Sequence, residues 1–228
     1  MVDGKSNMDI SKLHVLYEDN HVIVVEKPVN IAVMEDSSQD LDLLSIVKEY
    51  IKVKYDKPGN VFVGLVHRLD RPVGGIMVFA RTSKAAGRLS DQVRTHQFSK
   101  TYHAVVCGKP KREDTLRDYM RKDSKKNTSY VCKEKDPDAK YAELSYTLVD
   151  TKNDLSLVKI ALKTGRSHQI RVQFSSRGYP LWGDQRYNKN AVKGQQIALF
   201  ASTLEFIHPT TKELMHFELP LPSRAPWF

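Results

Sequence analysis

The chain has 228 residues, of which 40% are hydrophobic and 28% charged, and its formal net charge at pH 7 is +9. This length and composition are typical of a folded globular protein, and no apolar run reaches the eighteen or so residues that a membrane-spanning helix needs. The start of the chain lacks the apolar segment of a secretory signal, and the only two cysteines, Cys107 and Cys132, have no metal-ligand spacing. We therefore expect a cytoplasmic protein without disulfides.

Apolar patterns in the first part of the chain predict four strands and two helices. Runs of β-branched and other apolar residues indicate strands at Leu13–Tyr17, Val22–Glu26, Val61–Val66 and Ile76–Ala80. Apolar residues recur at helical spacing over 39–53, which predicts an amphipathic helix. Ser83 is placed to cap a second helix, which we expect to end near Thr95.

The rest of the chain is richer in strands. They are expected at 98–107, 115–119, 127–133, 140–149, 155–162, 196–207 and 213–218. A helix is expected over 167–177, with Gly178 as its stop, and the proline-rich tail 220–228 should be irregular. This pattern predicts an α+β fold, a mixed, largely antiparallel β-sheet core flanked by a few helices. We expect one domain at 13–219, between an N-terminal tail at 1–12 and the C-terminal tail.

The excess of basic residues bears on the kind of partner. Lys and Arg total 36 against 27 Asp and Glu, which suits a polyanion such as nucleic acid, although many basic proteins bind none. Lysines are dense in the segment 121–140. This segment fits an RNA-gripping hairpin and a solvated loop equally well.

A carboxylate in an unusual setting is the first candidate for chemistry. Asp70 ends the stretch Gly64–Asp70 and is followed by Arg71-Pro72-Val73-Gly74-Gly75. A loop Asp is most often a surface or turn residue, or the partner of a structural Arg. Here the glycines let backbone approach closely, and neighbouring cations keep a carboxylate ionised. An ionised carboxylate can act as a nucleophile or as an acid–base group.

A second motif, Thr164–Val172, lies about a hundred residues downstream. Arg166 and the amides at the start of the predicted helix could hold a phosphate. The alternative is that Ser167 and Gln169 only cap the helix and that the arginines form surface ion pairs.

Together these motifs resemble those of the RluA-type RNA pseudouridine synthases. The His-Arg-Leu-Asp sequence implies that Asp70 is the catalytic residue, and Lys100-Thr101-Tyr102 implies that Tyr102 lies in the active site. The Thr-Gly-Arg-x-His-Gln-Ile-Arg sequence implies that Arg171 forms an ion pair with Asp70. The resemblance covers about residues 13–218 in order, with further matching blocks at Leu16–Asp19, Lys27-Pro28, Gly178–Tyr187, Leu199–Ala201 and Phe206–Pro209.

The resemblance implies an isomerase that converts specific uridines of structured RNA (tRNA or rRNA) to pseudouridine. The uridine is flipped out, with Arg68 filling its place and Tyr102 stacking on the base and offering a hydroxyl for the C5 proton. The implied substrate-binding residues are His67, Arg68, Arg166, His168, Gln169 and Leu199. The reaction implies neither a cofactor nor a metal. We expect an RNA stem-loop as partner, no membrane, no obligatory protein partner and a monomer.

The chain departs from the family pattern in three places, and two other functions compete. Val73-Gly74-Gly75 replaces Thr-Ser-Gly, Phe200 replaces a His, and Asn30 replaces a Gly. A catalytically silent RNA-binding module would keep only the basic surface. A hydrolase would need a second carboxylate, for which Asp184 is the one motif-borne candidate. About twelve residues precede the first matched strand, so we expect no S4-type RNA-binding domain.

Overall fold

The computed structural model describes residues 12–36 and 38–228, so the predicted N-terminal tail lies almost wholly outside the described residues. The chain divides into two compact units. Unit 1 comprises Met1–Phe98 and Thr203–Leu219, and unit 2 comprises Ser99–Ser202 and Pro220–Phe228. The described residues form eleven strands and three helices, which agrees with the predicted excess of strands. None of these helices is long and apolar enough to cross a bilayer.

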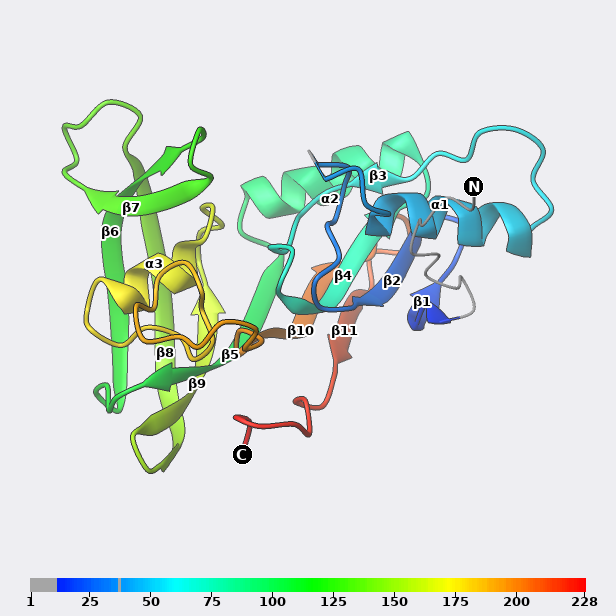
Figure 1. Cartoon of the computed structure of the whole chain (residues 1–228). Helices are drawn as coiled ribbons and strands as arrows, with labels where there is room; N and C mark the ends of the chain where they lie inside the picture. Colours follow the sequence, from blue (N-terminus) through cyan, green and yellow to red (C-terminus); the bar gives the residue numbers. More distant parts are fainter. Residues whose placement is uncertain (1–11, 37) are drawn as a thin grey trace. The chain divides into compact units, whose positions relative to one another are not determined.

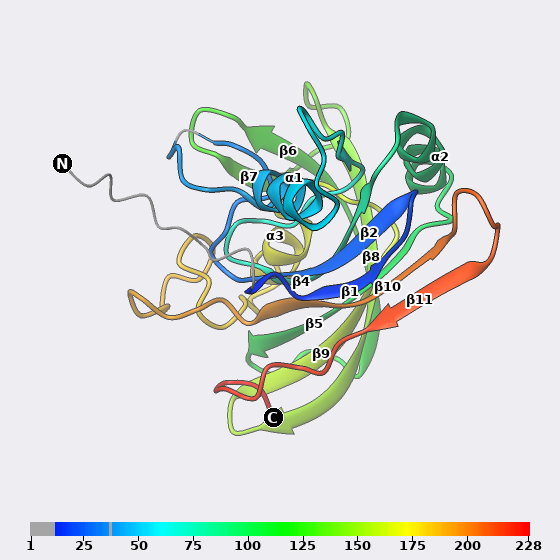
Figure 2. The ribbon, with the colours of Figure 1, turned by 90° about the vertical axis from the view of Figure 1, so that its right-hand side faces the viewer.

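Unit 1 is built on antiparallel strands with two helices on one side (Figure 2). Its elements are β1 (Val15–Glu18), β2 (Val22–Lys27), α1 (Leu43–Lys54), β3 (Gly64–Leu65), β4 (Gly74–Ala80), α2 (Ser83–Arg94), the second half of β10 (Leu199–Ile207) and β11 (Leu214–Glu218). Strand β4 pairs with β2 and β3, and every one of its residues is buried. Burial on both faces explains why β4 is a continuous apolar run rather than an alternating one.

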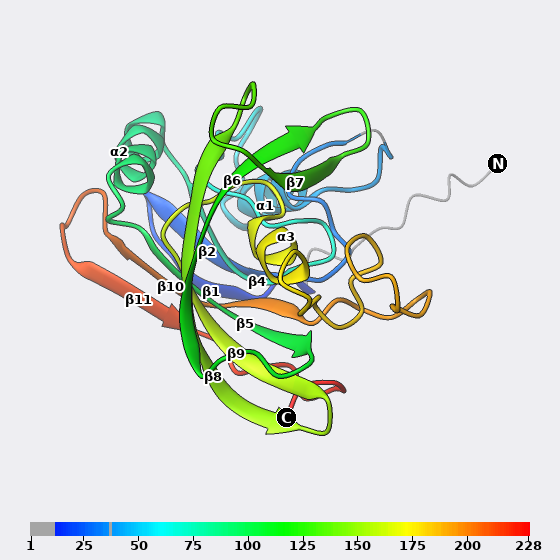
Figure 3. The same cartoon turned by 90° about the vertical axis from the view of Figure 1, so that its left-hand side faces the viewer.

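Unit 2 is built on an antiparallel sheet whose strands pair over long registers (Figures 1 and 3). Its elements are β5 (Ser99–Cys107), β6 (Glu113–Asp123), β7 (Thr128–Cys132), β8 (Lys140–Lys152), β9 (Leu155–Leu162), α3 (Gln169–Ser175) and the first half of β10. The strand order is β5-β9-β8-β6-β7. Helix α3 packs against one face of this sheet, where the rings of Phe174 and Tyr146 lie 5.1 Å apart.

The helix starts differ from the predicted ones for reasons of capping. Helix α1 begins at Leu43 rather than at 39, because the Asp42 side chain accepts a hydrogen bond from the Ser45 amide at 3.0 Å. Helix α2 is capped by Thr82 and not by Ser83, since the Thr82 hydroxyl accepts from the Ala85 amide.

Two further predicted boundaries were wrong, while one helix stop is confirmed. Strand β3 has two residues instead of the six expected at 61–66. Helix α3 is shorter than 167–177, because His168 adopts a left-handed conformation with φ of 55° just before it. Gly178 ends the helical segment with φ of 81°, a value that favours glycine.

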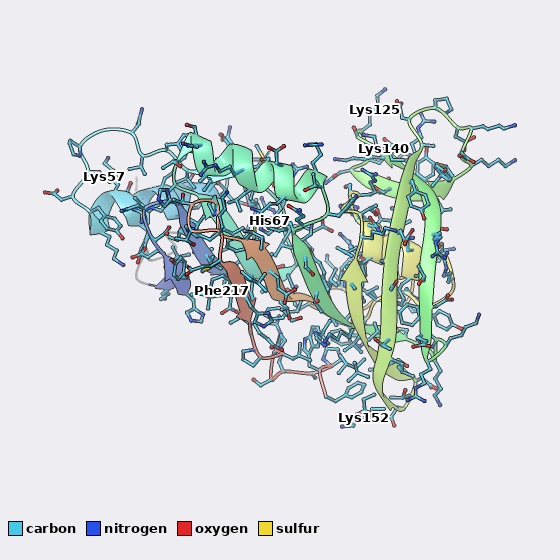
Figure 4. All side chains as sticks on the ribbon, turned by 180° about the vertical axis from the view of Figure 1, so that it is seen from behind. Lys57, His67, Lys125, Lys140, Lys152 and Phe217 are labelled. Carbon is cyan, nitrogen blue, oxygen red and sulfur yellow. The ribbon has the colours of Figure 1, made fainter. Side chains whose placement is uncertain are left out.

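The basic segment 121–140 forms an ordered hairpin with a following loop. Strands β6 and β7 pair in register up to Asp123 and Thr128. Figure 4 shows Lys125 and Lys140 at one end of unit 2 and Lys152 at the other. The Arg186 guanidinium donates to the carbonyls of Lys126 and Asn127, which ties the hairpin turn to the rest of unit 2.

The C-terminal tail is irregular, as predicted, and it belongs to unit 2. Leu221, Trp227 and Phe228 pack against a buried apolar cluster formed by Val105, Leu157 and Ala198. The tail therefore covers core side chains of this unit.

Candidate active site

Asp70 lies in unit 1, on the loop between β3 and β4, and its side chain is half-buried. The Asp70 carbonyl accepts a hydrogen bond from the Val73 amide at 3.0 Å, which closes a tight turn directly after the carboxylate. The glycines that follow open strand β4, whose pairing with β2 begins opposite Lys27. The loop is thus connected on one side to a fully buried strand.

The buried side chain of Lys27 holds this loop through hydrogen bonds to its backbone carbonyls. Its side chain is completely buried, and Nζ donates to the carbonyls of Pro28 at 2.8 Å, Arg71 at 3.0 Å and Val73 at 2.7 Å. Three acceptors match the three N–H bonds of an ammonium group. Burial lowers the pKa of Lys27 to about 7, whereas the Asp70 carboxylate acts in the opposite direction. Lys27 therefore fixes the backbone on the C-terminal side of Asp70, and below about pH 7 it also adds positive charge near the carboxylate.

Arg71 directs its charge to another segment of unit 1. Its guanidinium pairs with Asp36 at 2.8 Å and with Asp40 at 2.7 Å, and it also donates to the Ser38 hydroxyl. The pairing lowers the pKa of Asp36 to about 2. Arg71 therefore binds the segment before α1 to the Asp70 loop, a role that its position next to Asp70 in the sequence did not indicate.

The two other predicted binding residues of this loop differ in exposure. His67 is buried, its Nε2 accepts from the Val78 amide at 3.1 Å, and its ring lies 5.1 Å from that of Phe98. Figure 4 shows its position in unit 1. Arg68 is exposed, with Nη1 4.0 Å from the sulfur of Met34. Arg68 can reach a bound molecule, whereas the observed contacts of His67 support the loop from within the core.

The remaining predicted site residues lie in unit 2. Tyr102 is on β5 opposite Ile160 of β9 and is buried, and Leu199 is buried at the start of β10. Arg171 is on α3, with 5% of its surface exposed. A buried arginine needs a charged partner, because an isolated charge is costly to remove from water.

Asp184 is a partner of Arg171. The Nε and Nη2 atoms of Arg171 lie 2.9 and 2.8 Å from the two carboxylate oxygens of Asp184, which is itself buried. The amides of Arg186 and Tyr187 also donate to this carboxylate. Both oxygens are engaged, which argues against the acid–base role that a hydrolase would require of Asp184. A guanidinium has five N–H donors, and the two bonds to Asp184 use only two of them.

Gln169 is the centre of a hydrogen-bond network within the second motif, Thr164–Val172. Its Oε1 accepts from the Thr164 hydroxyl at 2.7 Å and from the Arg166 amide at 3.0 Å, and its Nε2 donates to the Glu143 carbonyl and to Gln173. These contacts use its donors and both oxygen lone pairs. The geometry therefore favours a role in holding the 164–168 loop, and substrate binding by Gln169 stays a prediction.

Arg166 and His168 are better placed to meet a ligand. Arg166 is exposed, and its Nε donates to the Tyr141 carbonyl at 2.8 Å. The Nδ1 atom of His168 lies 2.7 Å from the Tyr187 hydroxyl, which also accepts from the Ser129 amide. Tyr187 thus joins α3 to the β6–β7 hairpin, and its ring lies 5.1 Å from the Arg171 guanidinium.

Sequence reasoning gave no role to Lys27 and Tyr187, and it considered Asp184 only as the second carboxylate that a hydrolase would need. All three lie in blocks that match the family, but their roles depend on contacts distant in sequence. A lysine at the end of the apolar run of β2 was the one available signal for a buried cation. No group of three or more His, Cys, Asp or Glu side chains in residues 12–36 and 38–228 is arranged to hold a metal ion.

Comparisons with known proteins all find RNA pseudouridine synthases. A family model described as RNA pseudouridylate synthase matches residues 21–176. Ribosomal large subunit pseudouridine synthase C of Buchnera aphidicola subsp. Schizaphis graminum is 32% identical, over 91% of this chain and 67% of that protein. The corresponding synthase D of Zymomonas mobilis is 30% identical, over 92% of this chain and 69% of that protein.

Solved structures show the same fold. Human RNA pseudouridylate synthase domain containing 4 superposes with a TM-score of 0.76 at 21% identity, covering 92% of this chain and 89% of that one. Human RNA pseudouridylate synthase domain containing 1 gives a TM-score of 0.75 over 92% and 84%. The predicted α+β fold with a mixed, mostly antiparallel sheet is confirmed.

Proposed function

The chain belongs to the RNA pseudouridylate synthase family, and we propose that Asp70 is the nucleophile with which it converts specific uridines of structured RNA to pseudouridine. The observation that carries this role is the buried Lys27, which binds two carbonyls of the Asp70 loop and, below about pH 7, adds positive charge near its carboxylate. A fixed loop presents the nucleophile in one orientation, which lowers the entropy cost of reaching the transition state.

The chemistry requires only groups that the chain itself supplies. The N1–C1′ bond of the uridine breaks, a C5–C1′ bond forms, and the proton on C5 is lost while N1 gains one. The reaction is an isomerisation without net redox change, so the expectation of no metal and no cofactor stands as part of the proposal. Tyr102 supplies a stacking face and a hydroxyl for the C5 proton, and Arg68 occupies the place of the flipped base.

We infer that the substrate class is ribosomal RNA of the large subunit. The support is the names of the relatives, which are large-subunit synthases C and D, and the net charge of +9, which suits a polyanion. A transfer RNA is the alternative outcome of the mapping experiment below. A monomeric state and a cytoplasmic location belong to the same proposal.

A tritium-release assay tests the role of Asp70. RNA labelled with tritium at C5 of uridine, taken from cells that lack the gene, releases tritium when C5 loses its proton. We expect release with the wild-type protein and none with Asp70→Asn, which keeps the shape and loses the charge. The matched control is Asp91→Asn, which changes an exposed carboxylate of α2 that forms an ion pair with Arg94. Appreciable turnover by Asp70→Asn would contradict the assignment.

Mapping the pseudouridines identifies the substrate. We expect total RNA from a deletion strain to lack one or a few pseudouridines of large-subunit rRNA, and the wild-type gene to restore them while Asp70→Asn does not. Loss confined to tRNA would replace rRNA as the substrate class and leave the reaction unchanged.

A further inference from the structure

A cavity of about 260 Å³ opens in unit 2 near the C-terminal end of α3. Three aromatic and three charged residues form most of its lining, namely Tyr146, Phe174, Tyr179, Lys111, Asp114 and Arg177. Its volume is below the roughly 300–1,000 Å³ of sites that enclose a drug-sized ligand. The cavity therefore suits a smaller planar group, and none of the predicted site residues lines it.

The aromatic residues form an apolar wall with polar tips. Phe174 is buried at the base, and its ring lies 5.1 Å from that of Tyr146 at an interplanar angle of 55°. Tyr179 follows α3 in the chain and also lines the cavity. Neither tyrosine hydroxyl has a hydrogen-bond partner in the part of the chain that the structure describes. Such a surface offers a stacking face and hydroxyls that can bond to a ligand.

Asp114 gives the cavity an acceptor. It lies opposite Tyr146 in the β6–β8 register, so the two side chains project from the same face of the sheet. One carboxylate oxygen of Asp114 accepts from the Thr115 amide at 2.8 Å, and the other has no hydrogen-bond partner among the described residues. A free carboxylate oxygen beside aromatic rings can accept from the amino group of a heterocyclic base.

The charged residues around the opening differ in whether an ion pair within the protein already engages them. The connection between β5 and β6 carries Lys109, Lys111 and Arg112, none of which forms an ion pair with another described residue. Arg177 is instead held by Asp118 at 2.9 and 3.2 Å, which makes it part of the cavity wall. Exposed cations beside an aromatic cavity are a combination that suits single-stranded nucleic acid.

We propose that this cavity binds one unpaired nucleobase of the substrate RNA, selected for an exocyclic amino group as in cytosine. The base stacks on the aromatic wall that Tyr146 and Tyr179 help to form, its amino group donates to Asp114, and Lys111 contacts a flanking phosphate. Uracil lacks the amino group and binds less well. The inference rests on the proposed RNA substrate, and it adds a second point of contact on unit 2 that reads a nucleotide other than the modified uridine.

Fluorescence anisotropy with short labelled oligonucleotides tests the base pocket. The probes are oligocytidine, oligouridine and an abasic ribose-phosphate oligomer, each bound to the Asp70→Asn protein to prevent turnover. We expect Tyr179→Ala to weaken oligocytidine at least about five-fold and to leave the abasic oligomer unchanged. Phe62→Ala, which removes an exposed aromatic ring of unit 1, is the matched control and should have no such effect.

Two further variants separate base recognition from charge. Asp114→Asn should lower the ratio of the oligocytidine affinity to the oligouridine affinity, because the neutral amide is a weaker acceptor. Lys111→Ala should weaken all three probes alike and reduce the slope of log affinity against log salt by about one.

The results also separate this inference from the proposed function. The base pocket is overturned if Tyr179→Ala binds oligocytidine like the parent protein, or if it loses affinity equally for the abasic oligomer. If circular dichroism shows that Tyr179→Ala is unfolded, Asp114→Asn decides instead. An unchanged ratio of oligocytidine to oligouridine affinity in that variant would overturn the base pocket. A protein that binds none of the probes, nor ribosomal RNA, would instead contradict the proposed substrate.

Discussion

Arg171 and Asp184 form a buried bidentate ion pair that links helix α3 to the turn that follows it, with nitrogen–oxygen distances of 2.9 and 2.8 Å. Their side chains are 6% and 0% exposed. Because Asp184 also accepts from two backbone amides, it orients the Arg171 guanidinium rigidly. The family resemblance implies Asp70 as a further partner of Arg171, so Asp184 becomes a positioning residue for the predicted catalytic pair.

Removing the charge of Asp184 should therefore cost stability. Asp184→Asn keeps the side-chain shape but leaves Arg171 buried with less compensation, and we expect a loss of about 3–5 kcal/mol in the free energy of unfolding. Urea denaturation measures this loss. The control Asp91→Asn, in an exposed ion pair with Arg94, should change stability by less than about 1 kcal/mol. Equal effects of the two substitutions would show that the buried pair has no special role.

Arg171 should matter for stability and for activity in separable ways. Arg171→Ala should lower both, and Arg171→Lys should recover part of each, because it keeps the charge but loses the planar fork. The double variant Arg171→Met/Asp184→Leu removes both buried charges, and it should regain stability without regaining tritium release. Normal turnover by Arg171→Ala or by the double variant would refute a role for Arg171 beside Asp70.

Lys27 should make stability depend on pH. Its folded-state pKa of about 7 lies below the ordinary value of 10.5. Between these values the unfolded chain binds more protons, so the Lys27 contribution to stability should grow as the pH rises from about 7 towards 10.5 and should be lost as it falls through about 7. The unfolding free energy of the wild type minus that of Lys27→Met, measured by urea denaturation at several pH values, checks this. A difference independent of pH would contradict a buried, titrating Lys27.

Arg68 should act in base flipping more than in binding. Arg68→Met keeps most of the side-chain length and removes the donors, so turnover should fall far more than RNA affinity. Activity should recover in part on an RNA whose target uridine is mismatched, because flipping then costs less. If Arg68→Met instead loses affinity and rate equally on paired and mismatched RNA, Arg68 is a phosphate contact and its flipping role is wrong.

The sequence by itself determined the elements and the position of the predicted nucleophile. Most of the strands, the stop signal of Gly178 after α3 and the irregular tail follow from local patterns, because alternation, apolar runs and positive φ are properties of neighbouring residues. The predicted helix starts differed from the observed ones, since several polar residues near Asp42 and Thr82 could each have capped the helix.

The partners of the buried charges were decided only by the tertiary structure. Lys27 donates to carbonyls 44 and 46 residues away, and Arg171 pairs with a carboxylate 13 residues further along the chain. The pattern around Arg71 indicated a cation for Asp70, yet its side chain pairs with Asp36 and Asp40. A charge that leaves water must take whichever partner the packed chain brings within reach, and that choice depends on burial and long-range contacts rather than on spacing in the sequence.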